Sequence, residues 1–447
     1  MSCRDLNTDA VAIVGYGYIG GVIGAVLADR GFDVVGIEPN ARIRQRVEAG
    51  EAPVREPGLD ELTAKAVKAG RLHITDDPSA VRDCSVILIT VGTPLDSAGD
   101  ADQTQIAAAA EAIAPHLADD QLVMLKSTVP PGCTTSRLAP ILRRHSNVHV
   151  AFCPERLAEG NAIGEFLSVP VVVGGIDAAS TEAARDFWQR ALETQVMVVA
   201  SATGAEMVKL ADNLWIDLNI ALANELAKLC DRLGDIDVLE VIKAANTLPK
   251  VDYNVNILLP SVGVGGYCLT KDPWFVHQLG KKLGLELQTP KTSRLVNDQS
   301  PLYAAELIDA HLKDGRSSNP DEPATIAVLG LSFKSNTGDV RFTPTLPTIE
   351  RLIEMGYALR LYDPWLDREE AGDLFPRPIE TDIRETLRDA DCVAFFTGHR
   401  EFHEFPLEDL ARLLRPNALV FDGRMYFERN EIEQLRALGL RYKGVGR

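Results

Sequence analysis

Residues 10–20 read AVAIVGYGYIG, an apolar run that leads directly into a glycine-rich turn. The run predicts a short buried strand, and residues 17–30 predict the helix that follows it. The turn has the spacing G-x-G-x-x-G, in which glycines let the backbone approach a pyrophosphate at the N-terminus of a helix. A dinucleotide cofactor is therefore expected to contact the residues of this turn, namely Gly15, Gly17, Tyr18, Ile19 and Gly20.

A second strand is predicted at residues 33–37, and Glu38 stands at its end. A carboxylate there accepts hydrogen bonds from the ribose hydroxyls and repels a 2′-phosphate, which favours NAD over NADP. Arg42, one helical turn further on, would weaken that exclusion. The alternative is a glycine-rich turn with a carboxylate placed nearby by chance. We expect NAD as the cofactor.

Strand-like and helix-like runs alternate through the first 200 residues, with further strands expected at 85–91, 121–126, 148–152 and 169–173. Strands separated by such helices form a parallel sheet covered on both faces. The segments VGTP and KSTVPPG each follow a strand, and ligands bind at the carboxyl ends of such strands. Ordinary turns are the alternative. We expect these segments to place Val91, Gly92, Thr93, Ser127 and Thr128 near the nicotinamide.

Residues 204–233 predict one long helix, with apolar residues at three- and four-residue spacing. About thirty residues would extend about 45 Å, which suits a spine between domains or a subunit interface. A polar linker is expected at 313–323, and strands resume at 325–329, 358–362, 392–396 and 418–421. The sequence thus predicts an α/β fold with two Rossmann-like, doubly wound parallel-sheet domains joined by a long central helix. The expected domains are residues 1–202, 203–312 and 320–447.

A net charge of −18 argues against nucleic acid or an anionic membrane as a partner. No apolar run reaches membrane-spanning length, and the first residues lack the pattern of a signal peptide. The seven cysteines are dispersed, which predicts free thiols rather than disulfides. No Cys/His grouping has zinc spacing, so we expect no metal site. A cytoplasmic location is expected.

Two pairs of polar residues suggest oxidation chemistry. Lys209 and Asn213 are four residues apart on the long helix, so they share a face and suit the stabilisation of an alkoxide-like oxygen. The alternative is a solvated polar stripe. In PERLAEG, residues 154–160, Glu155 and Glu159 suit water activation, or else they are surface acids at the start of a helix.

The stretch PSVGVGGYCLTKDPW, residues 260–274, places a thiol at the end of a glycine-rich loop. A thiol near a nicotinamide suits covalent catalysis, and Gly263, Gly265 and Gly266 would let the backbone wrap closely around a ligand. Lys271 would favour the thiolate, and Asp272 would orient a neighbouring catalytic group. Most lone cysteines are buried and inert, which is what we expect of the other six. Cys268 differs because a loop has no packing reason to carry it.

Several of these motifs, in this order, resemble those of the nucleotide-sugar 6-dehydrogenases, the UDP-glucose, GDP-mannose and UDP-N-acetylhexosamine enzymes. The resemblance runs nearly end to end through GYGYIG, EPGL (56–59), VGTP, STVPPG, PERLAEG, the Lys209/Asn213 pair, GVGGYCLTKDP and the FK…DVR segment (333–341). It implies a four-electron oxidation of a nucleotide sugar at C6, from primary alcohol to carboxylate, through a thiohemiacetal and a thioester. Two NAD are reduced for each nucleotide uronic acid formed.

The resemblance also implies residue roles. Cys268 attacks the aldehyde, Lys209 and Asn213 hold the oxyanion, and Glu155 with Thr128 positions a water. Asp272 supports the lysine or the water, and Glu159 tunes the same network. Lys334 and Arg341 meet the substrate diphosphate, the arginine in some relatives coming from a neighbouring subunit. Lys271 is added to the cofactor contacts. The implied substrate contacts are Glu155, Arg156, Leu157, Lys209, Asn213, Tyr253, Gly265, Cys268, Phe333, Lys334 and Arg341.

The overall pattern is most similar to the branch that oxidises UDP-N-acetylmannosamine or UDP-N-acetylglucosamine. Tyr267 stands where that branch usually has histidine, Lys271 is more typical of the UDP-glucose branch, and Trp215 with Ile216 replaces an arginine. A UDP-glucose 6-dehydrogenase is therefore the alternative. Two further classes are a two-electron hydroxyacid dehydrogenase and a non-catalytic NAD-binding regulator. We expect a homodimer or higher oligomer through the long helix.

Overall fold

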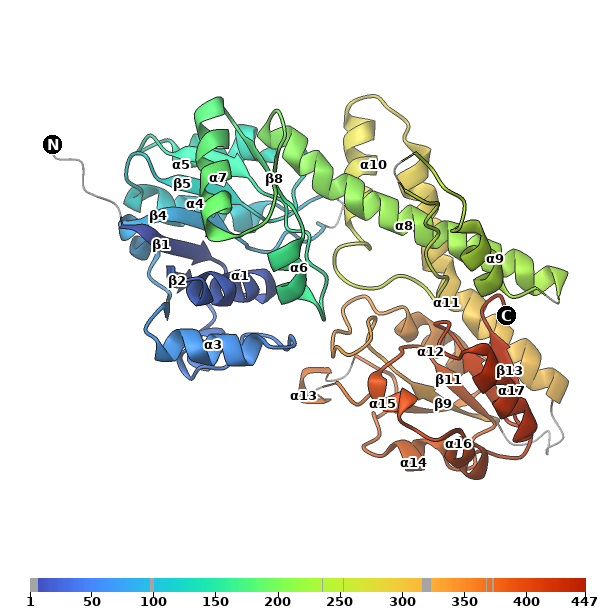
Figure 1. Cartoon of the computed structure of the whole chain (residues 1–447). Coiled ribbons are helices and arrows are strands. Elements are labelled where there is room, and N and C mark those ends of the chain that lie inside the picture. Colours follow the sequence, from blue (N-terminus) through green and yellow to red (C-terminus); the bar gives the residue numbers. More distant parts are fainter. Residues whose placement is uncertain are drawn as a thin grey trace. The chain divides into compact units, whose positions relative to one another are not determined.

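The computed structural model describes residues 7–96, 100–234, 236–251, 253–315, 323–366, 368–371 and 374–447. The chain divides into two compact units (Figure 1). The first comprises Met1–Asp212 with Trp274–Leu285, and the second comprises Asn213–Pro273 with Glu286–Arg447. Each unit is built around one sheet with helices on both faces, which confirms the predicted α/β class.

The sheet of the first unit has eight strands in the order β3-β2-β1-β4-β5-β6-β7-β8. Their bounds are β1 (Asn7–Val14), β2 (Asp33–Ile37), β3 (Leu72–Thr75), β4 (Cys84–Ile89), β5 (Leu122–Leu125), β6 (His149–Phe152), β7 (Val171–Gly175) and β8 (Val196–Val198). All neighbouring pairs are parallel except β6 and β7, which are antiparallel. The predicted parallel sheet is confirmed, with β6–β7 as the one antiparallel pair among the described strands. After β6 the chain forms α6 (Ala162–Ser168), and β7 then begins next to the carboxyl end of β6. The two strands therefore run in opposite directions.

Helices cover both faces of this sheet because alternate residues of each strand point to opposite sides. Ile13 of β1 packs in one core with α1 and α7, whereas Val14 packs in another with α4 and α5. The helical segments are α1 (Tyr18–Asp29), α2 (Ala41–Glu48), α3 (Leu59–Lys68), η1 (Pro78–Asp83), α4 (Thr104–Ile113), η2 (Ala114–His116), η3 (Thr134–Leu138), α5 (Ala139–Leu142) and α7 (Ala178–Ala191). Strands β3 and β8 were not predicted; most of their residues are half-buried or exposed, whereas the equally short β5 and β6 are almost wholly buried.

The sheet of the second unit has five parallel strands in the order β10-β9-β11-β12-β13. They are β9 (Thr325–Leu329), β10 (Ala358–Tyr362), β11 (Cys392–Phe395), β12 (Leu419–Asp422) and β13 (Arg441–Gly444). Around them lie α12 (Thr345–Glu354), α13 (Arg368–Ala371), α14 (Ile383–Leu387), α15 (Arg400–His403), α16 (Leu407–Leu413) and α17 (Arg429–Ala437). The polar strand β13 was not predicted, because RYKG has no apolar run.

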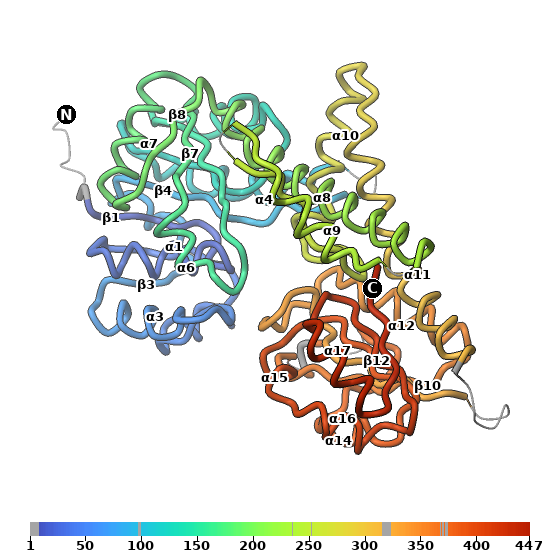
Figure 2. The backbone as a smooth tube through the Cα atoms, turned by 45° about the vertical axis from the view of Figure 1, so that its right-hand side comes forward, coloured from blue at the N-terminus to red at the C-terminus, as the bar shows by residue number. Residues whose placement is uncertain are grey.

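Long helices account for the middle of the chain. The predicted long helix is present as α8 (Ala202–Leu233), and it is followed by α9 (Val238–Ala245), α10 (Asp272–Lys282) and α11 (Gln288–Gly315). In the second unit, α11 lies alongside α12 (Figure 2). The expected linker begins too early, because α11 continues through residue 315; the linker residues 316–322 lie outside the described residues.

Candidate active site

The glycine turn lies at the carboxyl end of β1, where α1 begins. Gly15 has φ +89, a left-handed conformation that favours glycine. A Cβ on Gly20 would lie 2.2 Å from the Gly15 carbonyl oxygen, which also accepts a hydrogen bond of 2.5 Å from the Thr90 hydroxyl. Gly17 is the N-cap of α1 and supplies no side-chain cap. The backbone N–H groups of this helix end are thus positioned for an anion.

Glu38 closes the turn from the end of β2. One carboxylate oxygen accepts from the Tyr16 N–H at 2.8 Å, and the other accepts from the Asn40 N–H at 2.9 Å. Arg44 donates to the carbonyls of Glu38 and Pro39 at 2.8 Å. Arg44 was not predicted from the sequence, because nothing in its spacing separates it from the exposed Arg42. The structure therefore holds the predicted ribose acceptor against the predicted phosphate turn.

The segments after β4 and β5 lie beside this turn, because β1, β4 and β5 are neighbours in the sheet. The Ser127 hydroxyl donates to the Val91 carbonyl at 2.7 Å and so joins the two segments. Thr93 and Ser127 are buried, Thr128 is half-buried, and Gly92 is exposed. The predicted contacts from VGTP and STVPPG are thus brought to the edge of the sheet that carries the glycine turn.

Glu56 of the EPGL segment joins two of the predicted motifs, a role that the sequence analysis did not assign. Its carboxylate accepts from the Tyr18 hydroxyl at 2.5 Å and from the backbone N–H groups of Gly160 and Ala162 at 2.8 Å. Burial and the bond to Glu56 raise the pKa of the Tyr18 phenol above its ordinary value, so the phenol remains a donor. Glu56 thereby fixes the PERLAEG segment against the start of α1.

Lys209 on α8 lies beside Glu155, with 3.7 Å between Nζ and Oε2. Both side chains are buried, so the interpretation of Lys209 as part of a solvated stripe is wrong. The other carboxylate oxygen of Glu155 accepts from the Leu157 N–H. Arg156, a predicted substrate contact, pairs with Asp212 at 3.0 Å. A lysine held near a carboxylate in a buried setting suits oxyanion stabilisation and proton transfer.

In the second unit Asp272 is fully buried and uses both carboxylate oxygens. Asn213 donates to one at 2.5 Å, and the Lys271 ammonium donates to the other at 2.6 Å. The positive charge of Lys271 is therefore paired with the negative charge of Asp272. This ion pair directly follows the loop that carries Cys268. Asn213 is also buried, which again excludes a solvated stripe.

Cys268 is exposed, whereas the other five cysteines in the described parts of the chain are buried. Burial raises the pKa of Cys84 and of Cys133 to about 12, which suppresses their thiolates at neutral pH. Cys3 lies outside the described residues. The expected contrast between Cys268 and the buried thiols is present wherever the chain is described.

The glycines before Cys268 pack against protein. Gly263 has φ +137 and Gly266 has φ +84. A Cβ on Gly265 would lie 2.4 Å from Cβ of Phe333, and one on Gly266 would lie 2.8 Å from the Phe333 ring. The predicted reason for these glycines was a ligand; the structure gives close contact with Phe333 as a reason. The cysteine loop and the loop after β9 therefore form one packed assembly.

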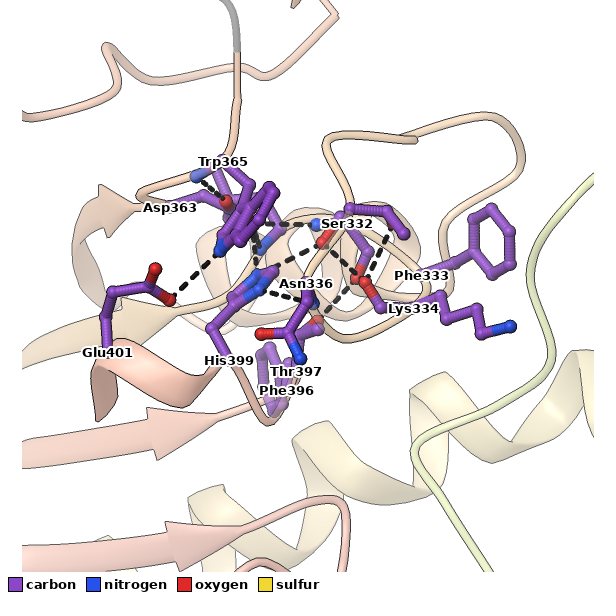
Figure 3. Close-up of polar contacts among 12 residues, drawn as sticks. Ser332, Phe333, Lys334, Asn336, Asp363, Trp365, Phe396, Thr397, His399 and Glu401 are labelled. Carbon is purple, nitrogen blue, oxygen red and sulfur yellow. Dashed lines mark hydrogen bonds and ion pairs between the residues drawn. The ribbon is translucent and has the colours of Figure 1, made fainter. Parts of the chain in front are cut away.

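The loop after β9 carries the predicted nucleotide contacts. Lys334 extends away from the polar cluster beneath it, and its ammonium has no carboxylate partner among the described residues (Figure 3). The Arg341 guanidinium is bound by Asp339 and lies 5.8 Å from the centre of the Tyr267 ring. Tyr253, another predicted substrate contact, is 71% exposed.

Arg424, which the sequence analysis missed, donates to the carbonyls of Phe333 and Phe396 at 2.8 Å each. Burial lowers the pKa of its guanidinium to about 10. Its side-chain acceptors are backbone carbonyls, and no carboxylate of the described residues forms an ion pair with it, so it places a positive charge close to the loop. The stretch DGR, residues 422–424, offered no periodic signal for it.

Comparison with protein-family models gives three matches in chain order. The models describe the UDP-glucose/GDP-mannose dehydrogenase family: its NAD binding domain at residues 9–192, its central domain at 203–299 and its UDP binding domain at 327–429. Together with the glycine turn and Glu38, these matches define an NAD-dependent oxidoreductase.

Full-length relatives agree with the family models. The chain is 32% identical over 430 residues to a UDP-N-acetyl-D-mannosamine dehydrogenase of Methanococcus maripaludis, covering 95% of this chain and 94% of the relative. It resembles the structure of a UDP-D-ManNAc dehydrogenase from Pyrococcus horikoshii (TM-score 0.86, 30% identity, 98% and 99% covered). It is equally similar to a UDP-glucose dehydrogenase from Pyrobaculum islandicum (TM-score 0.86, 29% identity, 100% and 99% covered). The chain belongs to the UDP-glucose/GDP-mannose dehydrogenase family.

Two further observations concern the described residues alone. No helix among the described residues is long and apolar enough to cross a membrane. In the same parts of the chain, no group of three or more His, Cys, Asp or Glu side chains is arranged to hold a metal ion.

Proposed function

We propose that this enzyme oxidises the C6 alcohol of a UDP-sugar to a carboxylate, with Cys268 as the covalent nucleophile. The observation that carries the proposal is the exposed thiol of Cys268 on a glycine loop next to the buried Lys271–Asp272–Asn213 group. A cysteine explains how a dehydrogenase can perform a second oxidation without releasing the aldehyde.

The reaction balances as follows. In each of the two oxidations the substrate carbon loses a hydride, for which bound NAD would be the acceptor, and the hydroxyl proton is released to solvent. The first converts the alcohol to an aldehyde, and the Cys268 sulfur adds to its carbonyl carbon to form a thiohemiacetal. The second oxidation gives a thioester. Water attacks the thioester carbonyl, the carbon–sulfur bond breaks, and the carboxylate and the thiol are released.

The remaining residues take roles that match their environments. Lys209, buried beside Glu155, stabilises the developing oxyanion, and Asn213 donates a hydrogen bond to it. Glu155 with Thr128 positions the hydrolytic water, and Glu159 tunes that network. Asp272 fixes the orientation of Asn213, since its carboxylate accepts from that amide. The NAD contacts assigned above and Lys271 complete the proposed site.

For the sugar we propose a UDP-N-acetylhexosamine of the ManNAc or GlcNAc type. Support comes from the named substrate of the archaeal relatives, which are UDP-N-acetyl-D-mannosamine dehydrogenases. UDP-glucose is the second candidate, supported by the structural likeness to a UDP-glucose dehydrogenase and by the YCLTKD run.

The test is a panel of UDP-, TDP- and GDP-sugars assayed for NADH and product mass. We expect two NADH per sugar and a product heavier by one oxygen and lighter by two hydrogens. Cys268→Ser should stall as an ester or at the aldehyde, and Cys268→Ala should lose the second oxidation while it still binds NAD and UDP-sugar. Cys230→Ala, at a buried thiol, is the matched control and should keep the stoichiometry.

Three results would contradict the proposal. Uronic acid formation by Cys268→Ala at a rate near that of the wild type would make the cysteine structural. One NADH per substrate with a hydroxyacid would indicate a two-electron dehydrogenase. Binding of NAD without turnover of any sugar in the panel would favour a regulator.

We also propose a homodimer, or a higher oligomer, formed through α8. Trp215, Leu218, Leu222 and Leu229 are 42–56% exposed and recur at helical spacing on this helix. A hollow of about 270 Å³ beside them is lined by α8 and α11. A second copy of the chain would bury this stripe. Light scattering should give at least a dimer for the wild type and a smaller species for Leu222→Glu.

The three functional segments 1–202, 203–312 and 320–447 and a cytoplasmic location remain part of this proposal. The family-model matches support the division. The described cysteines form no disulfide, which is consistent with a reducing compartment.

A further inference from the structure

A polar cluster of four buried residues and the half-buried Asn336 lies at the carboxyl edge of the second sheet and has no part in the proposed chemistry. It comprises Ser332, Asn336, Asp363, Thr397 and His399 (Figure 3). The strand order β10-β9-β11 places it where connections from neighbouring strands diverge to opposite sides. In open α/β sheets, ligands bind at this switch point.

Close approach of the loops defines the cluster. Gly330 has φ +87, and a Cβ there would lie 2.6 Å from Cβ of Thr397. The Thr397 hydroxyl donates to the Ser332 carbonyl at 2.5 Å. The loop after β9 and the loop after β11 are therefore tied together directly below the segment that carries Phe333 and Lys334.

His399 is fully buried, and its hydrogen bonds determine its tautomer. The backbone N–H of Asn336 can only donate, so Nδ1 of His399 accepts this bond, at 2.9 Å. Nε2 then carries the proton. It lies 3.1 Å from a carboxylate oxygen of Asp363 and 3.2 Å from the Ser332 hydroxyl. The imidazole thus bridges the end of β10 and the loop after β9.

The carboxylate of Asp363 contacts the start of the loop after β9. Its carboxylate accepts from the N–H groups of Leu331 and Ser332 at 2.7 and 3.1 Å. Asp363 therefore fixes the first residues of the loop, and His399 fixes Asn336, two residues beyond Lys334. The residues between these anchors include Phe333 and Lys334.

We propose that His399 is a positioning residue for nucleotide binding. Its Nδ1 holds the backbone of the loop after β9, so that Lys334 is presented to the substrate diphosphate. This proposal rests on the proposed function, in which Lys334 binds the diphosphate. It adds a histidine that contacts neither substrate nor NAD and acts through the Asn336 N–H.

Two substitutions test the two ring nitrogens of His399 separately. His399→Asn places an amide oxygen near the position of Nδ1, so it keeps an acceptor for Asn336 and loses the donor to Asp363. His399→Gln places an amide nitrogen near the position of Nε2, so it keeps the donor and loses the acceptor. His403→Gln, at an exposed histidine on α15, is the matched control.

The measurements are the Kd for UDP by calorimetry, the KM for UDP-sugar, the KM for NAD and the melting temperature. We expect His399→Gln to weaken UDP binding and raise the UDP-sugar KM about tenfold, the size of one lost hydrogen bond. The KM for NAD and kcat should change less than about twofold. His399→Asn should bind UDP more tightly than His399→Gln even where it melts lower. His403→Gln should behave as the wild type.

Lys334→Ala distinguishes failure of this proposal from failure of the proposed function. If Lys334→Ala binds UDP as the wild type does, the nucleotide site itself is misassigned. If Lys334→Ala is weakened and His399→Gln is not, His399 is only structural and the inference is overturned. Equal losses of UDP and NAD binding in His399→Gln would also overturn it.

A measurement on the wild type keeps the inference testable if neither variant folds. Selective ¹⁵N labelling of histidine should show one ring in the neutral form protonated at Nε2, in the free enzyme and with UDP bound. A proton on Nδ1 in every histidine ring would contradict the bond to Asn336 and with it the proposal.

Discussion

The two sheets place an acidic residue at the same position and use it differently. Glu38 follows the second strand of the first sheet, and Asp363 follows the corresponding strand of the second. Each accepts hydrogen bonds from the loop that follows the neighbouring strand. The loop that contacts Glu38 is a glycine turn that leads directly into α1. The loop that contacts Asp363 is longer and spans residues 330–344 before α12 begins.

The two loops suit two proposed ways of binding a diphosphate. The first sheet offers the backbone N–H groups of a helix terminus, which a compact glycine turn leaves accessible. The second offers the side-chain cations Lys334 and Arg341, which lie on the long loop after β9. Asp363 and His399 anchor this loop. A single acidic position thus carries the proposed ribose acceptor in one sheet and an internal anchor in the other.

The largest effect is expected from crowding the glycine turn. A Cβ on Gly20 would lie 2.2 Å from the Gly15 carbonyl oxygen, so Gly20→Val must displace backbone. Overpacking of this kind costs about 3 kcal/mol or more, which is on the order of 100-fold in affinity for NAD. Calorimetry with NAD and with UDP should show loss of the first only.

Gly17→Ala is the matched control for this turn, because a Cβ there meets no atom within 4 Å. It should melt like the wild type. Wild-type affinity for NAD in the Gly20→Val protein would show that the turn does not bind the cofactor.

Removal of the ribose acceptor should have the next largest effect. Glu38→Ala should weaken NAD binding about 10- to 100-fold, since hydrogen bonds to a charged group contribute about 1.5–3 kcal/mol. It should also reduce the discrimination against NADP. The ratio of kcat/KM with NAD and with NADP measures both effects. Asp363→Asn should leave this ratio unchanged, and a wild type that prefers NADP would refute the assignment.

Loss of one cation from the loop after β9 should have a smaller effect. Arg341 is half-exposed and already bound by Asp339, so Arg341→Ala should raise the KM for UDP-sugar by about three- to tenfold. The KM for NAD should not change. Arg351→Ala, at a surface arginine on α12, is the control. Equal changes in both KM values would contradict a role at the diphosphate.

Complementation tests whether Arg341 acts within its own chain. Arg341→Ala and Cys268→Ala subunits are mixed and assayed for UDP-sugar oxidation. Recovered activity would place the arginine in a site shared between subunits, and no recovery would place it in the site of its own chain.

The smallest effect concerns the pH dependence of stability. Burial opposes ionisation of Asp363, but hydrogen bonds from His399, Leu331 and Ser332 outweigh it, so its pKa lies below the ordinary value. Because the folded state favours the carboxylate, its contribution is present above the ordinary pKa of about 4 and is lost as the pH falls below it.

Urea unfolding of the wild type and of Asp363→Asn measures this contribution. The two free energies of unfolding should differ by about 1 kcal/mol at pH 7 and converge below about pH 4. Conversely, a difference that stays constant down to pH 3 would show that ionisation of Asp363 does not stabilise the loop.

Much of the fold could be predicted, because its signals are local. Strand β2 (Asp33–Ile37) and strand β9 (Thr325–Leu329) match their predicted bounds, and α8 differs by two residues at its start. Apolar runs and helical periodicity report such elements directly. The antiparallel pairing of β6 and β7 escaped prediction because strand direction depends on where the returning segment packs.

The residues of the candidate site also fall into two groups, those that local motifs predict and those that they do not. The positions of Glu38 and Cys268 follow from motifs, since each is defined by residues close by in sequence. Glu56, His399 and Arg424 were missed because their partners lie 28 to 106 residues away along the chain. No local pattern records such distant contacts.

The sequence by itself determined the α/β class, the dinucleotide turn, the long helix and the cysteine loop, because turn chemistry and periodicity act over a few residues. Only the tertiary structure decided which polar groups are buried and how they are paired. It placed Lys209 beside Glu155, bound Asp272 to Asn213 and Lys271, and locked His399 between Asp363 and Asn336. Burial and hydrogen-bond partners arise when distant segments pack together, and they set the charge and orientation of each group.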